Sequence, residues 1–170
     1  MNISLDSAAK AAEIAGAIAV VIGLIFVGFE VRSNTVAQRF TATQALVSEY
    51  NSAIKAINNH EFVCLYTKAS NDFNSLNQQE KIRYSVFTLQ ILRIFEQLHY
   101  SAVQGTIDPN VYSGFERQLS SLVQVTGYQQ YWTARRDWFG VLFQSYVDRL
   151  ISDRTVEPAN FEFEECDDSD

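Results

Sequence analysis

Glu96 and His99 have the one spacing in this sequence that is typical of a metal site. Three residues apart on a helix, a carboxylate and an imidazole lie one turn from each other, and di-iron helical bundles use such a pair twice, with two further glutamates. Here the pair occurs once, and His60 is the only other histidine. Glu96 is also expected to point away from the apolar face of its helix. A metal-dependent bundle enzyme is therefore the weakest of the hypotheses below.

Cys64 follows His60 by four residues, a spacing that puts a thiol and a base on the same face of a helix. Nucleophilic catalysis uses such a pair, but a cysteine within the apolar stretch EFVCLY is more typical of a small buried hydrophobe. Cys64 and Cys166 form no spacing motif, so we expect two unpaired thiols in a reducing compartment. Glycine-rich phosphate loops, nucleophile elbows and zinc motifs are absent from the sequence. We therefore expect no enzymatic activity, no cofactor and no resident metal.

The composition excludes several classes of protein. The 170 residues suit one domain, and the 47% hydrophobic content, seven glycines and two cysteines exclude collagen, a disulfide scaffold and wholesale disorder. The net charge of -7 argues against a nucleic-acid partner, since phosphate neutralisation needs a basic surface.

Residues 14–29 form an uncharged apolar run between Glu13 and Glu30. Extended to residues 11–31, the run would measure about 31 Å as a helix, close to the roughly 30 Å of a hydrocarbon core. We predict a single transmembrane helix at residues 11–31, preceded by a flank at residues 1–10. A cleaved signal peptide and a buried soluble helix are the alternatives. Two arginines after the run against one lysine before it favour a cytoplasmic C-terminal portion.

A stripe of small residues lies on one face of this predicted helix. Its members are Ala12, Gly16, Ala19 and Gly23. Small residues let membrane helices approach closely, so the stripe predicts self-association, although alanine and glycine are also common in such helices. Beyond the predicted membrane helix, residues continue to recur at alternating steps of four and three positions, which is the spacing of a heptad seam. The seam consists of Val36, Phe40, Thr43, Val47, Tyr50, Ile54 and Ile57. This seam predicts either a coiled coil between copies or packing against helices further along the chain.

The rest of the chain predicts helices. One helix covers residues 6–58; Ser75 and Gln78 form a capping box for the next, which ends at residue 104. Asp108 and Pro109 open a helix to residue 125, and a last helix covers residues 128–152. The buried face of the second helix is predicted at Tyr84, Phe87, Ile91, Ile94, Phe95, Leu98 and Ala102. That of the last is predicted at Trp132, Phe139, Leu142, Phe143, Tyr146 and Leu150, with Arg136 placed for a cation contact with the indole or an ion pair.

The fold class is therefore all-α. A single N-terminal transmembrane helix continues into a long helix and packs with a C-terminal helical bundle, the whole helical domain covering residues 32–152. Residues 153–170 differ in composition, with seven acids among the last fourteen residues. We expect a solvated, mobile tail. The alternative is that the FEFE segment at residues 161–164 docks onto a basic or apolar patch of a partner.

Two segments resemble an uncharacterised family of small single-span bacterial inner-membrane proteins with a C-terminal helical domain. The first follows the apolar run and consists of Glu30, Arg32, Asn34, Thr35, Ala37 and Arg39. The second comprises Gly105, Gly127, Tyr131, Trp132, Phe143, Tyr146, Val147 and Asp148. The resemblance covers most of residues 11–152. It implies a location in the bacterial inner membrane and carries no activity with it.

The favoured hypothesis is a membrane-anchored, non-enzymatic scaffold or accessory subunit, with the lipid bilayer and copies of itself or a membrane complex as partners. The residues predicted to carry self-association are Ala12, Gly16, Ala19, Gly23, Val36, Phe40 and Val47. A second hypothesis is an oligomeric channel or transport component, in which Glu13 and Glu30 form charged rings at the mouths.

Overall fold

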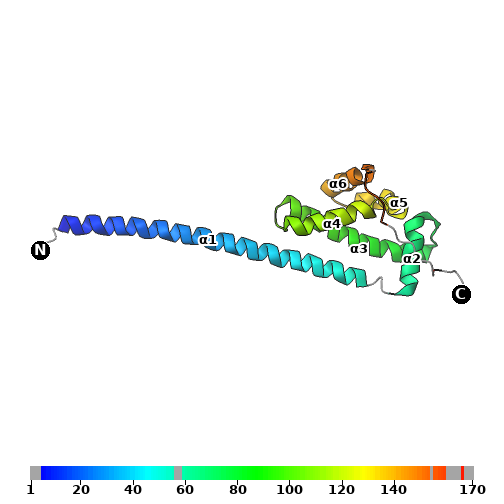
Figure 1. Cartoon of the computed structure of the whole chain (residues 1–170), viewed down its shortest axis with the longest axis horizontal. Coiled ribbons are helices and arrows are strands. Elements are labelled where there is room, and N and C mark those ends of the chain that lie inside the picture. Colours follow the sequence, from blue (N-terminus) through cyan, green and yellow to red (C-terminus); the bar gives the residue numbers. More distant parts are fainter. Residues whose placement is uncertain (1–4, 56–58, 154, 160–165, 167–170) are drawn as a thin grey trace. The chain divides into compact units, whose positions relative to one another are not determined.

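The structure is a computed structural model that describes residues 5–55, 59–153, 155–159 and 166. Within these residues the chain is helical and contains no strand, which confirms the all-α prediction. The helices, shown in Figure 1, are α1 (Leu5–Ile54), α2 (His60–Asn71), α3 (Gln78–Val103), α4 (Pro109–Leu122), α5 (Thr126–Arg135) and α6 (Val141–Ser152), with 3₁₀ helices η2 (Phe73–Ser75) and η3 (Arg136–Trp138).

The chain divides into two compact units, Met1–Thr41 and Ala42–Asp170. The first unit consists of the N-terminal part of α1. In it the apolar run is helical without interruption, as the absence of proline predicts. The second unit contains the last turns of α1 and all later elements. Within the described residues one helix is long and apolar enough to cross a membrane, and its apolar window is entirely exposed.

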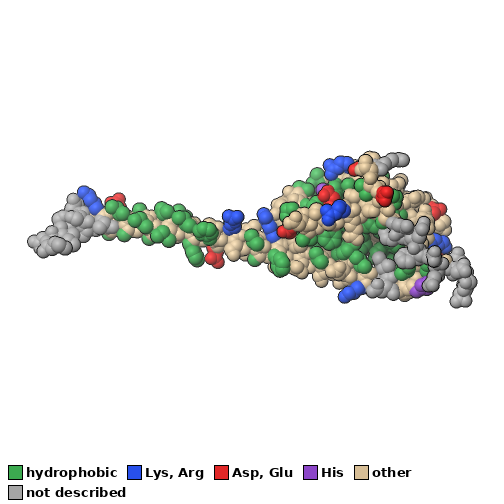
Figure 2. Space-filling view, viewed as in Figure 1, with side chains coloured by type: hydrophobic (Ala, Val, Ile, Leu, Met, Phe, Trp, Pro, Cys, Tyr) green, Lys and Arg blue, Asp and Glu red, His purple; other side chains and the backbone are tan. Residues whose placement is uncertain are grey.

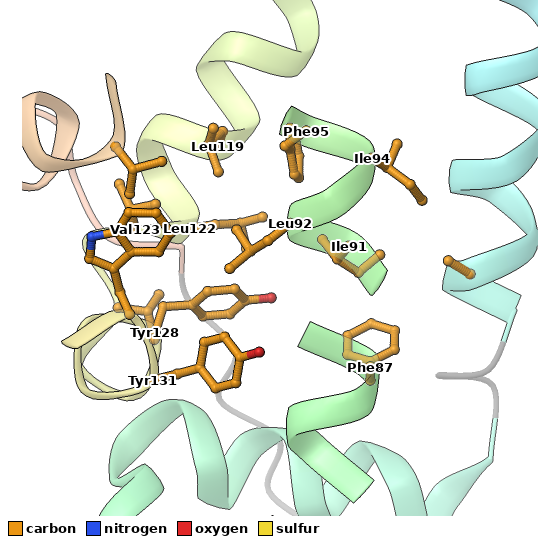
Figure 3. Close-up of a cluster of buried hydrophobic side chains, with 14 of the residues drawn as sticks. Phe87, Ile91, Leu92, Ile94, Phe95, Leu119, Leu122, Val123, Tyr128 and Tyr131 are labelled. Atoms are coloured by element: carbon orange, nitrogen blue, oxygen red, sulfur yellow. The ribbon is translucent and has the colours of Figure 1, made fainter. Parts of the chain in front are cut away.

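The second unit is built around α3, whose buried face meets α2, α4 and α6. All of the residues predicted for that face are buried, except Ala102, which is partly buried and packs at its edge. Figure 3 shows the centre of this core, where Leu92 of α3 lies between Leu119 of α4 and the rings of Tyr128 and Tyr131 of α5. The 3.6-residue period of α3 therefore identified one buried face, while Thr88, Leu92 and Glu96 are buried outside the predicted set.

The capping box of α3 lies two residues beyond its predicted position. The Asn77 side chain accepts a hydrogen bond from the Glu80 amide at 3.0 Å, and the Glu80 carboxylate accepts one from the Asn77 amide at 2.7 Å. Ser75 instead ends η2 and donates to the Asp72 carbonyl. The pairs Ser75/Gln78 and Asn77/Glu80 both have the three-residue spacing of a capping box. The turn at η2 decided that the second pair caps the helix.

The predicted last helix at residues 128–152 is wrong, because the segment is broken into α5, η3 and α6. Gly127 belongs to the first turn of α5 and does not terminate α4. A Cβ placed there would lie 1.8 Å from the Ala69 carbonyl oxygen, so α5 crosses α2 at backbone contact. The break between α5 and α6 also leaves Leu142 exposed, contrary to the predicted stripe.

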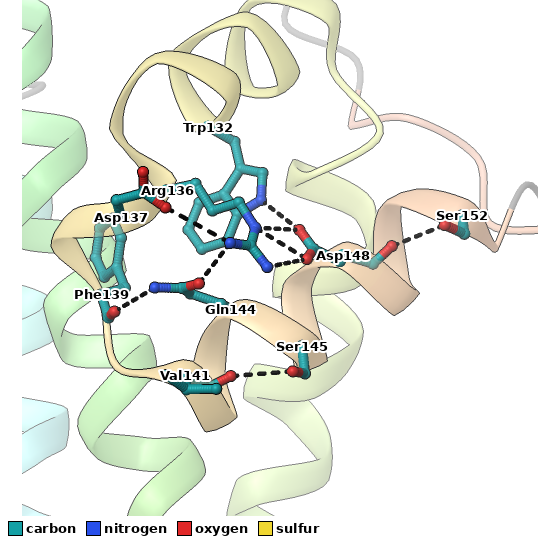
Figure 4. A network of polar contacts seen from close by, with 9 residues as sticks. All are labelled: Trp132, Arg136, Asp137, Phe139, Val141, Gln144, Ser145, Asp148 and Ser152. Atoms are coloured by element: carbon teal, nitrogen blue, oxygen red, sulfur yellow. Dashed lines mark hydrogen bonds and ion pairs between the residues drawn. The ribbon is translucent and has the colours of Figure 1, made fainter.

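Arg136 connects the two halves of this broken segment, as shown in Figure 4. Its guanidinium donates two hydrogen bonds to the Asp148 carboxylate of α6, at 3.0 Å from Nε and 2.7 Å from Nη2 to Oδ2. The Trp132 indole donates to the same carboxylate at 2.9 Å. Of the two predictions for Arg136, the ion pair is confirmed. The pair holds α6 folded back against α5.

Candidate functional site

The small-residue stripe lies on the part of α1 that makes up the first unit. Ala12, Gly16, Ala19 and Gly23 are all exposed, as is every residue from 12 to 42. A Cβ added at Gly16 or Gly23 would meet no atom within 4 Å. This face can therefore accept another backbone at close range, which is the geometry that small residues provide in membrane helices.

The bulky side chains of the apolar run are equally exposed. Between Ile14 and Val31, eleven large hydrophobic residues have more than half of their surface accessible. Figure 2 shows them as a hydrophobic surface, with charged side chains near both ends of the run. Each such side chain is worth about 1.5–3 kcal/mol when it leaves water, so the run as a whole disfavours an aqueous environment by about 20 kcal/mol. An apolar surface of this extent needs lipid or protein around it.

The structure divides the heptad seam into two parts. Val36 and Phe40 are exposed, with 61% and 66% of their surface accessible. Thr43 and Tyr50 are buried in the core of the second unit, and Val47 is half-buried. Ile57, the last residue of the predicted seam, lies outside the described residues.

Tyr50, in the buried part of the seam, packs against α3 and α4. Its ring makes edge-to-face contacts with Phe95 of α3 and Phe115 of α4, with centroid distances of 5.9 and 5.2 Å. Gln118 of α4 donates a hydrogen bond to the Tyr50 hydroxyl. Such aromatic pairs contribute about 0.5–1.5 kcal/mol each beyond the area they bury. At Tyr50 the seam therefore packs against helices of its own chain, and among the described residues of the seam Val36 and Phe40 are the ones that are exposed.

Cys64 and Cys166 form a disulfide, so the prediction of two unpaired thiols is wrong. The two cysteines are 102 residues apart in the chain, and the fold brings their Cα atoms to 5.3 Å. The only sequence signal for the pairing was the even number of cysteines, since a separation of this length has no motif. The prediction of a reducing compartment rested on free thiols, and the bond removes that support.

The described parts of the acidic tail are attached to the bundle. The Ala159 amide donates to the Ser121 carbonyl at 3.1 Å, and the Ser121 hydroxyl donates to the Glu157 carbonyl at 2.9 Å. The side chain of Ala159 packs against the core, and Cys166 is bonded to α2. Ala159 and Cys166 are therefore held by the bundle, whereas Glu157 and Pro158 are exposed, and the solvated, mobile tail over residues 153–170 stays a prediction. The FEFE segment lies outside the described residues.

Glu96 and His99 do not form a metal site. Glu96 is 7% exposed, and its carboxylate accepts hydrogen bonds from the Gly140 amide at 2.6 Å and from Arg93 at 2.6 Å. His99 stacks on the Tyr146 ring, with a centroid distance of 4.1 Å, and hydrogen-bonds to the Tyr112 hydroxyl. No group of three metal-ligating side chains occurs in the described part of the chain.

Glu96 was expected to point away from the core, and this expectation is wrong. Its helix is covered on that side by the segment between η3 and α6, which the predicted unbroken helix did not contain. Gly140 begins α6 without a side chain to cap it, and the Glu96 carboxylate takes that role by accepting the Gly140 amide.

His60 and Cys64 do lie close together, with Nε2 and Sγ 3.8 Å apart. The sulfur is bonded to Cys166, however, and a disulfide sulfur has no thiolate to act as a nucleophile. The pair of His60 and Cys64, the second pair with a spacing suited to catalysis, therefore has a structural role in the disulfide-bonded protein.

Comparisons with models of protein families, with curated proteins and with solved structures find no match to this chain.

Proposed function

We propose that this protein is a non-enzymatic, membrane-anchored helical scaffold or accessory subunit, located in a bacterial inner membrane and self-associating through the small-residue stripe of α1. The observation that carries the proposal is the complete exposure of the apolar run. A core helix of a soluble protein buries its apolar face, and none of this window is buried. A lipid environment removes the cost of that exposure, and the stripe then gives copies of the helix a surface for close packing.

The test of self-association compares opposite faces of one helix. The double variant Gly16→Ile/Gly23→Ile places two branched side chains on the stripe. The double variant Val21→Ile/Gly28→Ile adds bulk about 150° away around the same helix, where no contact is proposed. Native mass spectrometry in lipid nanodiscs or mild detergent should show oligomers for the wild type and the control, and monomers for the stripe variant. An oligomer that survives the stripe variant would contradict this mechanism.

The disulfide supports a location for the second unit. Disulfides form and persist in oxidising compartments, whereas the cytosol keeps thiols reduced. We therefore infer that residues 42–170 lie on the outer, periplasmic side of the membrane, in place of the cytoplasmic side favoured by the charge bias. That bias compared one lysine with two arginines, a difference too small to outweigh a covalent bond that needs an oxidising environment.

Thiol trapping in intact cells tests this location. Cells are quenched with acid, which preserves the thiol and disulfide states, and the denatured protein is then labelled with a maleimide of high mass, with and without prior reduction, and examined for a mass shift. We expect no labelling without reduction and two labels after it. Labelling of both cysteines in unreduced cells would place the second unit in the cytoplasm, without bearing on the self-association of α1.

A further inference from the structure

A groove on the second unit lies outside every site described above. It has a volume of about 570 Å³ and is bordered by the first half of α3, by η2 and by the end of α5 with η3. This volume is within the range of about 300–1,000 Å³ that is usual for sites of small organic ligands. The residues on which its chemistry depends are Lys81, Ile82, Val86, Arg135 and Trp138.

The charged residues that line the groove are cationic. Lys81 and Arg135 border it, and none of its lining residues is acidic. In the described part of the chain neither side chain forms an ion pair: the Lys81 ammonium donates to the Asn74 carbonyl at 2.9 Å, and Arg135 donates from Nη1 to the Ala134 carbonyl at 3.0 Å. The Arg135 Nε is buried without a hydrogen-bond partner. This atom is enclosed by the protein, so an anion in the groove could reach the guanidinium only through its other nitrogens.

Other cations on the same unit behave differently. Lys68 pairs with Glu80 at 3.1 Å, and Arg93 pairs with Glu96 at 2.6 Å. Arg135 instead stacks on the Trp138 ring, with 4.8 Å between its Cζ and the ring centroid. The stack orients the planar fork of the guanidinium without neutralising its charge. Arg93 donates to the Trp138 carbonyl at 2.8 Å, which holds this tryptophan in place.

The groove also has an apolar and exposed lining. Ile82 and Val86 lie one turn apart on α3 and have 58% and 64% of their surface accessible. Trp138 is 52% exposed, although its counterpart Trp132 is buried. Exposed aliphatic and aromatic surface next to two cations without carboxylate partners is complementary to a molecule with an anionic head and a hydrocarbon chain.

We propose that this groove binds a single-chain anionic amphiphile, whose carboxylate or phosphate head is held by Arg135 and Lys81 and whose hydrocarbon chain lies on Ile82, Val86 and Trp138. The head group would neutralise two cations that have no carboxylate partner among the described residues, through charge-assisted hydrogen bonds. The proposal is independent of the self-association of α1, because every residue that it uses lies on the second unit.

The test uses the full chain in nanodiscs of zwitterionic lipid and three matched probes: 8-bromooctanoate, 8-bromooctyl phosphate and 8-bromooctan-1-ol. Bromine quenches tryptophan emission on contact, and Trp138→Phe identifies the quenched residue. We expect saturable quenching by at least one of the two anions, and at least about tenfold weaker binding of the alcohol. The comparison of carboxylate with phosphate identifies the head group.

The double variant Arg135→Gln/Lys81→Gln should weaken binding of the anionic probe by about tenfold or more, without changing the affinity for the alcohol. Arg83→Gln is the matched control, because Arg83 lies on α3 and pairs with Glu61 outside the groove. Far-UV circular dichroism checks that each variant is folded. Equal binding of the alcohol and the anions, or unchanged anion binding by the double variant, would overturn the proposal. Tighter binding of a synthetic peptide of residues 157–170 than of either anion would likewise overturn it, in favour of an acidic peptide ligand.

Discussion

Residues 12–41 and the bundle from residue 42 onward place their apolar side chains in opposite ways. In the first region every residue is exposed, including the eleven large hydrophobics between Ile14 and Val31. In the bundle the large apolar residues of α3 and α5 surround a core in which Tyr84, Leu98, Tyr131 and Phe143 are fully buried. The same driving force acts on both regions. The bundle removes its apolar surface from water by folding, and the N-terminal region can do so only with lipid or another molecule.

Replacing a glycine should have different consequences in the two regions. The largest predicted change in stability is at Gly127 of the bundle. Gly127→Ala should destabilise the bundle by about 3 kcal/mol or more, because its Cβ would overlap the Ala69 carbonyl and α2 would have to move away from α5. The measurement is chemical denaturation followed by near-UV circular dichroism.

Gly16→Ala and Gly23→Ala are the matched controls from the first region, where the added Cβ meets nothing. They should change the stability of the bundle by less than about 0.5 kcal/mol. Gly114→Ala, at an exposed and open position of α4, should stabilise by about 0.5–1 kcal/mol through helix propensity. If Gly127→Ala were as stable as Gly114→Ala, the backbone contact between α2 and α5 would be wrong.

The disulfide is expected to have the next largest effect, and it belongs to the bundle alone. Cys64→Ser removes a cross-link between residues 102 apart and should cost about 2–4 kcal/mol, mainly by enlarging the unfolded ensemble. Dithiothreitol should lower the wild-type melting temperature to that of the variant and leave the variant unaffected. A wild-type protein that melts identically with and without reductant would show that the bond contributes no stability.

The ion pair between α5 and α6 should matter less because it is accessible to solvent. The hydrogen bond from Arg136, and to a smaller extent the hydrogen bond from Trp132, lower the pKa of Asp148 below its ordinary 3.8, although the partial burial of the carboxyl acts in the opposite direction. A lowered pKa stabilises the fold above that value, and the contribution is lost as the pH falls below it. Because 41% of the Asp148 side chain is exposed, Asp148→Asn should cost less than about 1 kcal/mol at pH 7.

The same variant distinguishes this ion pair from general acid unfolding. The stabilities of wild type and Asp148→Asn should converge as the pH falls below 3.8 and through the lower pKa of the folded protein, where the carboxylate becomes protonated. A constant difference across this range would mean that Asp148 stabilises the bundle through its shape and not through its charge.

His99 is expected to have the smallest effect. Burial, and secondarily the nearby Arg149, lower the pKa of His99 below its ordinary 6.5. The neutral imidazole therefore favours the folded state, so its contribution is complete above pH 6.5 and is lost as the pH falls through the lower folded pKa. Between pH 7 and pH 5 the wild type should lose less than about 1 kcal/mol, and His99→Gln should lose less than the wild type. Denaturation midpoints at the two pH values check this, and equal losses would contradict the assignment to His99.

The sequence by itself determined the helical class, the exposed apolar run and the buried face of α3. Each of these is a local property of the sequence. We can recognise a run of apolar side chains, the lack of strand signals and a 3.6-residue period without knowing the tertiary contacts. The stripe residues could be named in the same way, since Gly16 and Gly23 lie on one face of any continuous helix.

Tertiary structure decided where distant segments meet. The break between α5 and α6 places Asp148 against Arg136, buries Glu96 beneath Gly140 and leaves Leu142 exposed. Contact between α2 and the end of the chain converts two cysteines without a motif into a disulfide. The groove with Arg135 likewise requires α3, η2 and η3 together. These contacts join residues 12 to 102 positions apart, and their energies depend on a packing geometry that local periodicity does not contain.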